Sequence, residues 1–273
     1  MRKDTLSWLG PVLLALALAA ALWFFWARSE APEPELVPDQ APADAPVEAE
    51  DEQPEHPLAA TQEPPAEQPE LRPLPPLGQS DEYFKLELDD LFGERLSERL
   101  VENDLIERIV ATVDNLPRDQ IAERIRPMTA VPGQLLVREG EEEGEYYLDP
   151  ANYERYEPLV STVTTADTDQ VEEAYRRFYP LMQKAYTDLG YPDDYFNDRV
   201  IEVIDHLLET PEVDEPIRLV RPHVFYEFAD PGLEELSPGQ KLLLRMGGDN
   251  ASAVKLKLRE LRDRISANRE EGA

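Results

Sequence analysis

The feature that most constrains this chain is an uncharged run of 22 residues near its N-terminus, from Leu6 to Ala27. At about 1.5 Å per residue, a helix of this length spans roughly 33 Å, enough to cross a hydrocarbon core of ~30 Å. Trp8 lies near one end of the run, and Trp23 and Trp26 lie near the other, as in the aromatic belts at membrane interfaces. The run therefore predicts one transmembrane helix over residues 6–27.

The charges beside the run predict its orientation. Arg2 and Lys3 precede it, and after Arg28 the chain becomes acidic from Glu30. By the positive-inside rule, residues 1–5 form a cytoplasmic stub and everything after the span lies outside, which in a bacterium is the periplasm. A signal peptide cleaved before Glu30 is the alternative, but a signal core usually has only about 7–15 apolar residues. The sequence favours an uncleaved single-pass anchor in the inner membrane.

Residues 28–79 differ in composition from the rest of the chain. They hold 13 of the 26 prolines and 13 acidic residues, and no aromatic residue. Such a segment buries too little apolar surface to offset the entropy lost on ordering. We expect a disordered linker, which is either a spacer of required length or a passive connection.

A patterned region follows from residue 80 to residue 268, and residues 269–273 form a short tail. Apolar residues recur at helical spacing through most of this region. An acidic run with two glycines between Leu135–Val137 and Tyr146–Leu148 predicts a hairpin. The predicted fold class is mainly α: an irregular multi-helix periplasmic domain with a small β-hairpin, preceded by one transmembrane helix and a disordered linker.

Capping and proline signals predict several helix ends. Ser80, Asn103 and Ser237 precede helical patterns as N-cap residues. Pro180 is predicted to kink or split the longest helix, because proline lacks the N–H that an internal helical position donates.

Cysteine is absent, which excludes disulfides, thiolate nucleophiles and cysteine-ligated metals. The formal net charge of −31 makes nucleic acid an improbable partner, since the chain repels a phosphate backbone. Phosphate-binding glycine loops, nucleophile elbows and zinc-binding His-Glu-x-x-His motifs are also missing. Glu202 and His206 stand four residues apart, but both belong to the polar face of a helix and are expected to be solvated. No cofactor or metal is predicted, and whether the protein is an enzyme stays open, leaning to no.

Five short runs indicate a family. They are Val113-Asp-Asn-Leu-Pro-Arg118, Asn152-Tyr-Glu-Arg-Tyr156, Leu189-Gly-Tyr-Pro192, Tyr195-Phe-Asn-Asp-Arg199 and Ser237-Pro-Gly-Gln-Lys241. Through them the chain resembles, over about residues 72–266, the bacterial domain-of-unknown-function family numbered 3014. The resemblance implies an uncharacterised membrane-anchored envelope protein and carries over no catalytic residue.

Tyrosines and arginines crowd the middle of the patterned region, and such residues are common at binding surfaces. Helical spacing explains most of these tyrosines as core. The exceptions proposed as an exposed binding site are Tyr153, Tyr156 and Tyr195, with Arg155 and Arg199.

Basic residues gather only in residues 237–269, which carry eight basic and three acidic groups. Lys255, Lys257, Arg259 and Arg262 form this predicted basic patch. It either contacts anionic lipid or an acidic partner, or docks on the acidic body of its own domain. The internal docking is the preferred interpretation.

These observations favour a membrane-anchored, non-enzymatic binding or adaptor module for another envelope protein or for wall glycan (peptidoglycan). The alternative is a carboxylate-dependent envelope hydrolase acting on glycan, since two of the many acidic residues could meet in a cleft. Ligand, oligomeric state and pathway do not follow from the sequence.

Overall fold

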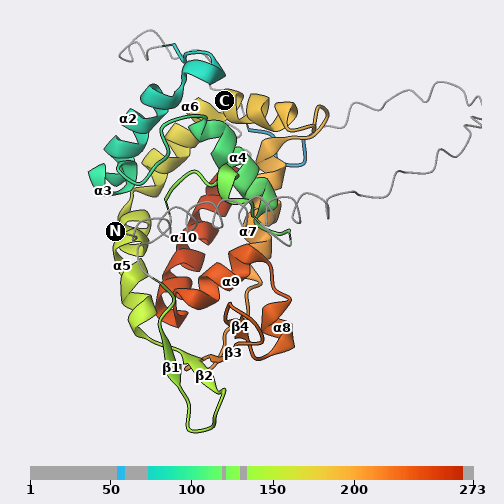
Figure 1. Ribbon diagram of the computed structural model, residues 1–273. Helices are drawn as coiled ribbons and strands as arrows, with labels where there is room; N and C mark the ends of the chain where they lie inside the picture. The colour runs from blue at the N-terminus through green and yellow to red at the C-terminus, as the bar shows by residue number, and fades with distance from the viewer. Residues whose placement is uncertain (1–53, 59–72, 119–120, 130–133, 267–273) are drawn as a thin grey trace, which may run out of the picture. The chain divides into compact units, whose positions relative to one another are not determined.

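The structure is a computed structural model that describes residues 54–58, 73–118, 121–129 and 134–266 (Figure 1). The predicted cytoplasmic stub, the predicted span, most of the predicted linker and the predicted tail lie outside the described residues. Within the described ranges, no helix is both long enough and apolar enough to cross a membrane.

Helices dominate the described chain, as predicted. The α-helices are α2 (Asp81–Phe92), α3 (Glu94–Ser97), α4 (Leu105–Asn115), α5 (Ala151–Thr165), α6 (Thr168–Asp188), α7 (Phe196–Leu208), α8 (Pro231–Glu234), α9 (Pro238–Arg245) and α10 (Gly248–Ser266). Short 3₁₀ helices cover Leu77–Gln79 and Glu123–Ile125.

The predicted single hairpin is one half of a larger sheet. Strands β1 (Val137–Glu139), β2 (Tyr146–Leu148), β3 (Arg218–Val220) and β4 (Glu227–Phe228) pair antiparallel in that order. The second hairpin joins the first through Tyr146 opposite Leu219 and Tyr147 opposite Arg218. Two- and three-residue strands leave too little periodicity to predict this pairing from sequence.

The largest apolar core lies where α6 packs against α2 and α4. Phe178 and Met182 of α6 meet Phe84 of α2 and Val110 of α4, all at most 6% exposed. Leu77 joins this core, so packing begins ahead of the predicted domain start at residue 80. In Figure 1, α10 runs between α5 and α7, and the strands lie at the end of the domain away from α2.

Some helix ends follow the sequence signals and others depend on tertiary contacts. Ser237 forms a complete capping box with Gln240, as its position indicates. The predicted cap Asn103 is off by one residue: Asp104 precedes α4, and the Asp81 carboxylate accepts from the Leu105 and Asp104 N–H groups at 2.7 and 3.0 Å.

Of the two outcomes predicted at Pro180, a kink or a split, the split does not occur: α6 is a single helix from Thr168 to Asp188. Phe178 and Met182 are buried on either side of the exposed Pro180. We attribute the unbroken helix to this packing, which offsets the hydrogen bond that proline cannot make.

Candidate functional site

The two hairpin turns lie at the same end of the sheet. Glu139 pairs with Tyr146 next to the first turn, and Val220 pairs with Glu227 next to the second. Because β2 and β3 are antiparallel neighbours, residues 140–145 and residues 221–226 project from the same end of the sheet. We call these two segments the hairpin tips.

The second tip exposes the two least buried large apolar side chains of the described residues. Val224 is 70% exposed and Phe225 is 79% exposed. Single exposed apolar residues are ordinary, whereas Val224 and Phe225 are adjacent and together make a small apolar surface at the end of a turn.

This tip is held in place by contacts at its base. The Arg221 Nε donates to the Val224 carbonyl oxygen at 3.3 Å, and its guanidinium lies 5.2 Å from the centre of the Tyr226 ring. Tyr226 in turn packs edge-on against Tyr146 of β2, with ring centres 5.1 Å apart. The apolar pair therefore stands on a braced loop, so ordering it on contact costs less entropy than for a loose one.

The first tip is acidic. Glu141, Glu142 and Glu143 are all exposed, and Gly144 makes the turn with a φ of 84°. Tyr147 Oη donates to Glu145 Oε1 at 2.7 Å. This hydrogen bond is the main cause of a lowered pKa at Glu145, with Arg218 contributing. The two hairpin tips together therefore present exposed apolar side chains beside negatively charged carboxylates.

The predicted tyrosine site does not form one surface. Tyr195 is 36% exposed, as expected. Tyr153 and Tyr156 are half-buried against two different apolar clusters. Burial, followed by the charge of Glu215, raises the pKa of Tyr153 to about 12. The expectation of exposure is therefore wrong for Tyr153 and Tyr156, because their helical positions on α5 face the sheet and α7–α10.

The two predicted arginines are also separate. Arg155 Nη1 donates to the Gln134 carbonyl oxygen at 2.7 Å and to Asn152 Oδ1 at 3.1 Å. Arg199 lies on α7, where its side chain is 16% exposed and reaches Asp114 at the end of α4. Each arginine holds together elements of the fold.

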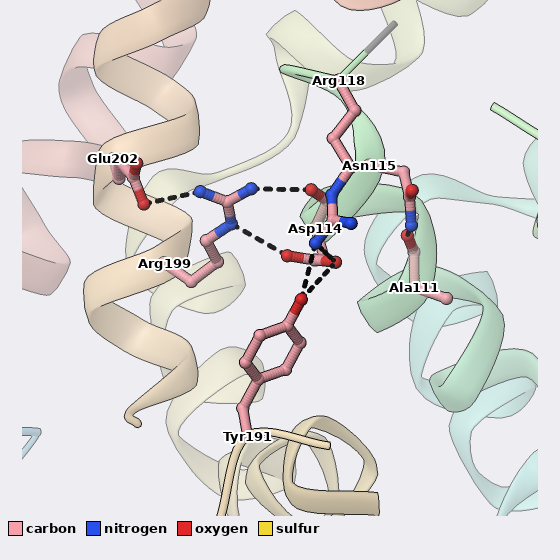
Figure 2. Close-up of polar contacts among 7 residues, drawn as sticks. All are labelled: Ala111, Asp114, Asn115, Arg118, Tyr191, Arg199 and Glu202. Carbon is pink, nitrogen blue, oxygen red and sulfur yellow. Dashed lines mark hydrogen bonds and ion pairs between the residues drawn. The ribbon is translucent and has the colours of Figure 1, made fainter. Parts of the chain in front are cut away.

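Figure 2 shows Arg199 between two carboxylates. Its Nε donates to Asp114 Oδ1 at 3.1 Å, and its Nη1 donates to Glu202 Oε2 at 2.6 Å. Arg118 Nη2 donates to Asp114 Oδ2 at 2.8 Å, and the same nitrogen donates to Tyr191 Oη at 2.5 Å. Burial opposes the charge of Arg199, but the hydrogen bond and charge of Glu202 and the charge of Asp114 outweigh it, so its pKa is raised. We call Asp114, Arg118, Tyr191, Arg199 and Glu202 the Asp114 cluster.

The Asp114 cluster does not have the form of a catalytic site. Asp114 is 4% exposed, and its carboxylate already accepts from two arginines and lies 3.4 Å from Tyr191 Oη. These three hydrogen bonds occupy most of the roughly four acceptor positions of this buried carboxylate. It joins α4, α7 and the Gly190–Tyr195 turn.

Three of the four predicted basic-patch residues make contacts inside the domain. Lys255 is 9% exposed and donates to the Thr210 carbonyl oxygen; its burial lowers its pKa. Lys257 Nζ donates to the Ala166 carbonyl oxygen and to Thr168 Oγ1. Arg262 donates to both carboxylate oxygens of Asp205, at 2.5 and 2.8 Å. Arg259 stays exposed. These contacts agree with internal docking of α10 on the acidic body.

The described residues that could take part in metal binding or in carboxylate-dependent hydrolysis are arranged as follows. His206 Nε2 lies 2.9 Å from Ser237 Oγ, which is the N-cap of α9. Among the described residues, no group of three metal-ligating side chains comes together. A cavity of about 470 Å³ between α2 and α5 has a single carboxylate in its lining, Glu157, whereas glycan hydrolysis by the usual route needs two.

Sequence reasoning missed Val224 and Phe225. The signal was present in Arg221-Pro222-His223, a proline-containing stretch of the kind that favours a turn, which lies between β3 and β4. Reading that break as a turn would have placed two apolar residues at a tip.

Comparison with known proteins gives one match. The model of a family described as "Protein of unknown function (DUF3014)" matches residues 105–262, more than half of the chain and within the range of the resemblance seen in the sequence. No curated protein and no solved structure matches the chain.

Proposed function

Since the chain belongs to the DUF3014 family of proteins of unknown function, we propose a function from its own surface: it is a tethered, non-enzymatic adaptor that binds another protein of the cell envelope through its hairpin tips. The observation that carries the proposal is the exposure of Phe225, 79%, beside Val224 on a braced turn. Buried aromatic anchors contribute most of the energy at protein interfaces, and rigid presentation reduces the entropy cost of binding.

The chemistry of the tips describes the partner. Phe225 and Val224 need an apolar pocket, and Glu141, Glu142 and Glu143 at the same edge favour lysine or arginine around it. The same carboxylates oppose docking on anionic lipid. We therefore favour a protein with a basic-rimmed apolar pocket over a membrane surface or glycan.

The address of this adaptor is part of the proposal. Residues 6–27 anchor the chain in the bacterial inner membrane, residues 1–5 stay in the cytoplasm, and the helical domain works in the periplasm. Support comes from the uncharged run and from the flanking charges.

The test is photocrosslinking in the bacterium, with a photoreactive amino acid in place of Phe225 in the full chain. The matched control places it at Leu86 of α2, which is 61% exposed. We expect a discrete protein adduct from position 225, absent from position 86 and lost on adding Val224→Ser. Equal labelling from both positions, or none from position 225, would overturn the proposal. Adducts to wall fragments would replace the protein partner with glycan.

A further inference from the structure

Residues 54–58, inside the predicted linker, lie against the first turn of α7. The Glu55 N–H donates to Asp198 Oδ2 at 3.0 Å, and the His56 N–H donates to Asp198 Oδ1 at 2.8 Å. Asn197 Nδ2 donates to the His56 carbonyl oxygen at 2.9 Å. Two adjacent side chains therefore hold three main-chain groups of one short segment.

The receiving side of this contact is built into the fold. Asn197 has no exposed surface, and its Oδ1 accepts from the Tyr175 hydroxyl at 3.1 Å. Its Nδ2 also donates to the Ile265 carbonyl oxygen at 3.2 Å. Burial raises the pKa of Tyr175 well above its ordinary value, so this hydroxyl keeps its proton. These contacts orient the amide so that Nδ2 faces the segment.

The segment itself suits the contact. Pro54, His56 and Leu58 are half-buried while Glu55 and Pro57 are exposed, and the backbone bends at Glu55 and His56, so that two successive N–H groups face one carboxylate. Pro54 and Pro57 have a fixed φ before any contact forms, which lowers the entropy cost of docking. Of its three N–H groups, those of Glu55 and His56 both go to Asp198.

Overall charge does not explain the contact. Glu55 is acidic, and the chain has a net charge of −31, so the segment and the domain repel each other at long range. Recognition therefore depends on the main-chain hydrogen bonds and the half-buried side chains.

We propose that Asn197 and Asp198 form a peptide-binding site for a short, proline-flanked segment that bends at the contact, and that its occupant is residues 54–58 of the same chain. The site fastens the linker to the domain at its middle. If the anchor lies at residues 6–27, only residues 28–53 then separate span and domain. At about 3.1 Å per residue the greatest reach is about 80 Å when the segment is docked, against roughly 160 Å for all of residues 28–79.

The test is hydrogen exchange of the Glu55 and His56 amides in the purified full-length chain. We expect exchange at least about tenfold slower than for an unstructured peptide, because two charge-assisted hydrogen bonds close these amides. Asp198→Asn should return both amides to the unprotected rate. The control Asp193→Asn changes an exposed carboxylate just before α7 and should leave protection intact.

A second variant acts from the segment and leaves the domain untouched. Glu55→Pro removes one of the two donors, so His56 should lose its protection while the melting temperature of the domain stays unchanged. The control Glu52→Pro adds a proline outside the contact and should preserve protection. Unprotected amides in the wild type, or protection that survives Asp198→Asn and Glu55→Pro, would overturn the site. Protection that grows with protein concentration would assign the occupant to a second copy and overturn docking within one chain.

Discussion

The polar face of α7 and the hairpin tips differ in how they use their side chains. Along α7, Arg199 pairs with Asp114, Asp205 with Arg262, and His206 with Ser237. At the tips, Glu141, Glu142 and Glu143 have no ion pair within the described part of the chain, and Phe225 lies in solvent.

This difference separates side chains that stabilise the fold from side chains that are exposed and could bind a partner. A polar helical face looks like a solvated surface in sequence, yet on α7 it joins α4, α9 and α10. The exposed tip residues Glu141, Glu142, Glu143, Val224 and Phe225 contribute little to packing. We therefore expect substitutions on α7 and its partners to change stability, and substitutions at the tips to change binding.

The largest expected effect is at Asp114. Asp114→Ala removes the carboxylate shared by Arg199 and Arg118 and leaves a mostly buried guanidinium short of a partner, so the free energy of unfolding should fall by about 3 kcal/mol or more. Chemical denaturation measures this. The control is Asp188→Ala, which breaks the exposed pair with Lys184 and should cost less than about 1 kcal/mol. Equal losses of unfolding free energy in the two variants would mean that buried and exposed ion pairs contribute alike to stability.

The second largest effect is expected at alkaline pH, which should lower the free energy of unfolding of the domain. Burial is the main cause that raises the pKa values of Tyr153, Tyr179 and Tyr186 to about 12, while unfolded tyrosine ionises near ~10. A raised folded pKa gives stability that is complete below pH ~10 and is lost as pH rises towards 12. Denaturation midpoints between pH 8 and 11.5, read with tyrosinate absorbance, check this. Tyr186→Phe should reduce the loss; ionisation of every tyrosine near pH 10 at constant stability would contradict it.

A smaller effect is expected at the start of α9. Ser237→Ala removes the acceptor for the Gln240 N–H and the partner of His206, which should lower the free energy of unfolding by about 0.5–2 kcal/mol. Thermal denaturation against Ser252→Ala, an exposed serine within α10, measures it. A neutral result at Ser237 would mean that α9 is positioned by its apolar contacts alone.

The smallest effect on stability is expected at the tip. Phe225→Ser should change the free energy of unfolding by no more than about 0.5 kcal/mol, as for other exposed positions, while abolishing the proposed protein contact. Leu219→Ala in the same sheet removes a side chain that is 3% exposed and should cost about 2–5 kcal/mol. A large loss of stability from Phe225→Ser would show that the tip is structural and would break the comparison.

Some of the site was within reach of the sequence and some was not. The capping box at Ser237 follows from local spacing. Opposite charge accounts for the contact of Arg262 with Asp205, whereas Lys255 and Lys257 donate to uncharged oxygens, which charge did not predict. Exposure of Tyr153 and Tyr156 was wrong, because which face of α5 is buried depends on where the sheet and α10 pack. The contact between Asp198 and residues 55–56 joins positions far apart in the chain, and no local pattern encodes it.

The sequence alone predicts the mainly helical character of the domain, the starts of α2 and α9, the acidic turn and the family. These follow from spacing, capping and composition, which act over a few residues. Tertiary contacts were needed to join two hairpins in one sheet, to continue α6 through Pro180, and to occupy the polar face of α7 with partners from α4, α9 and α10. Those outcomes depend on side chains that meet from distant parts of the chain, where packing and paired charge outweigh local preference.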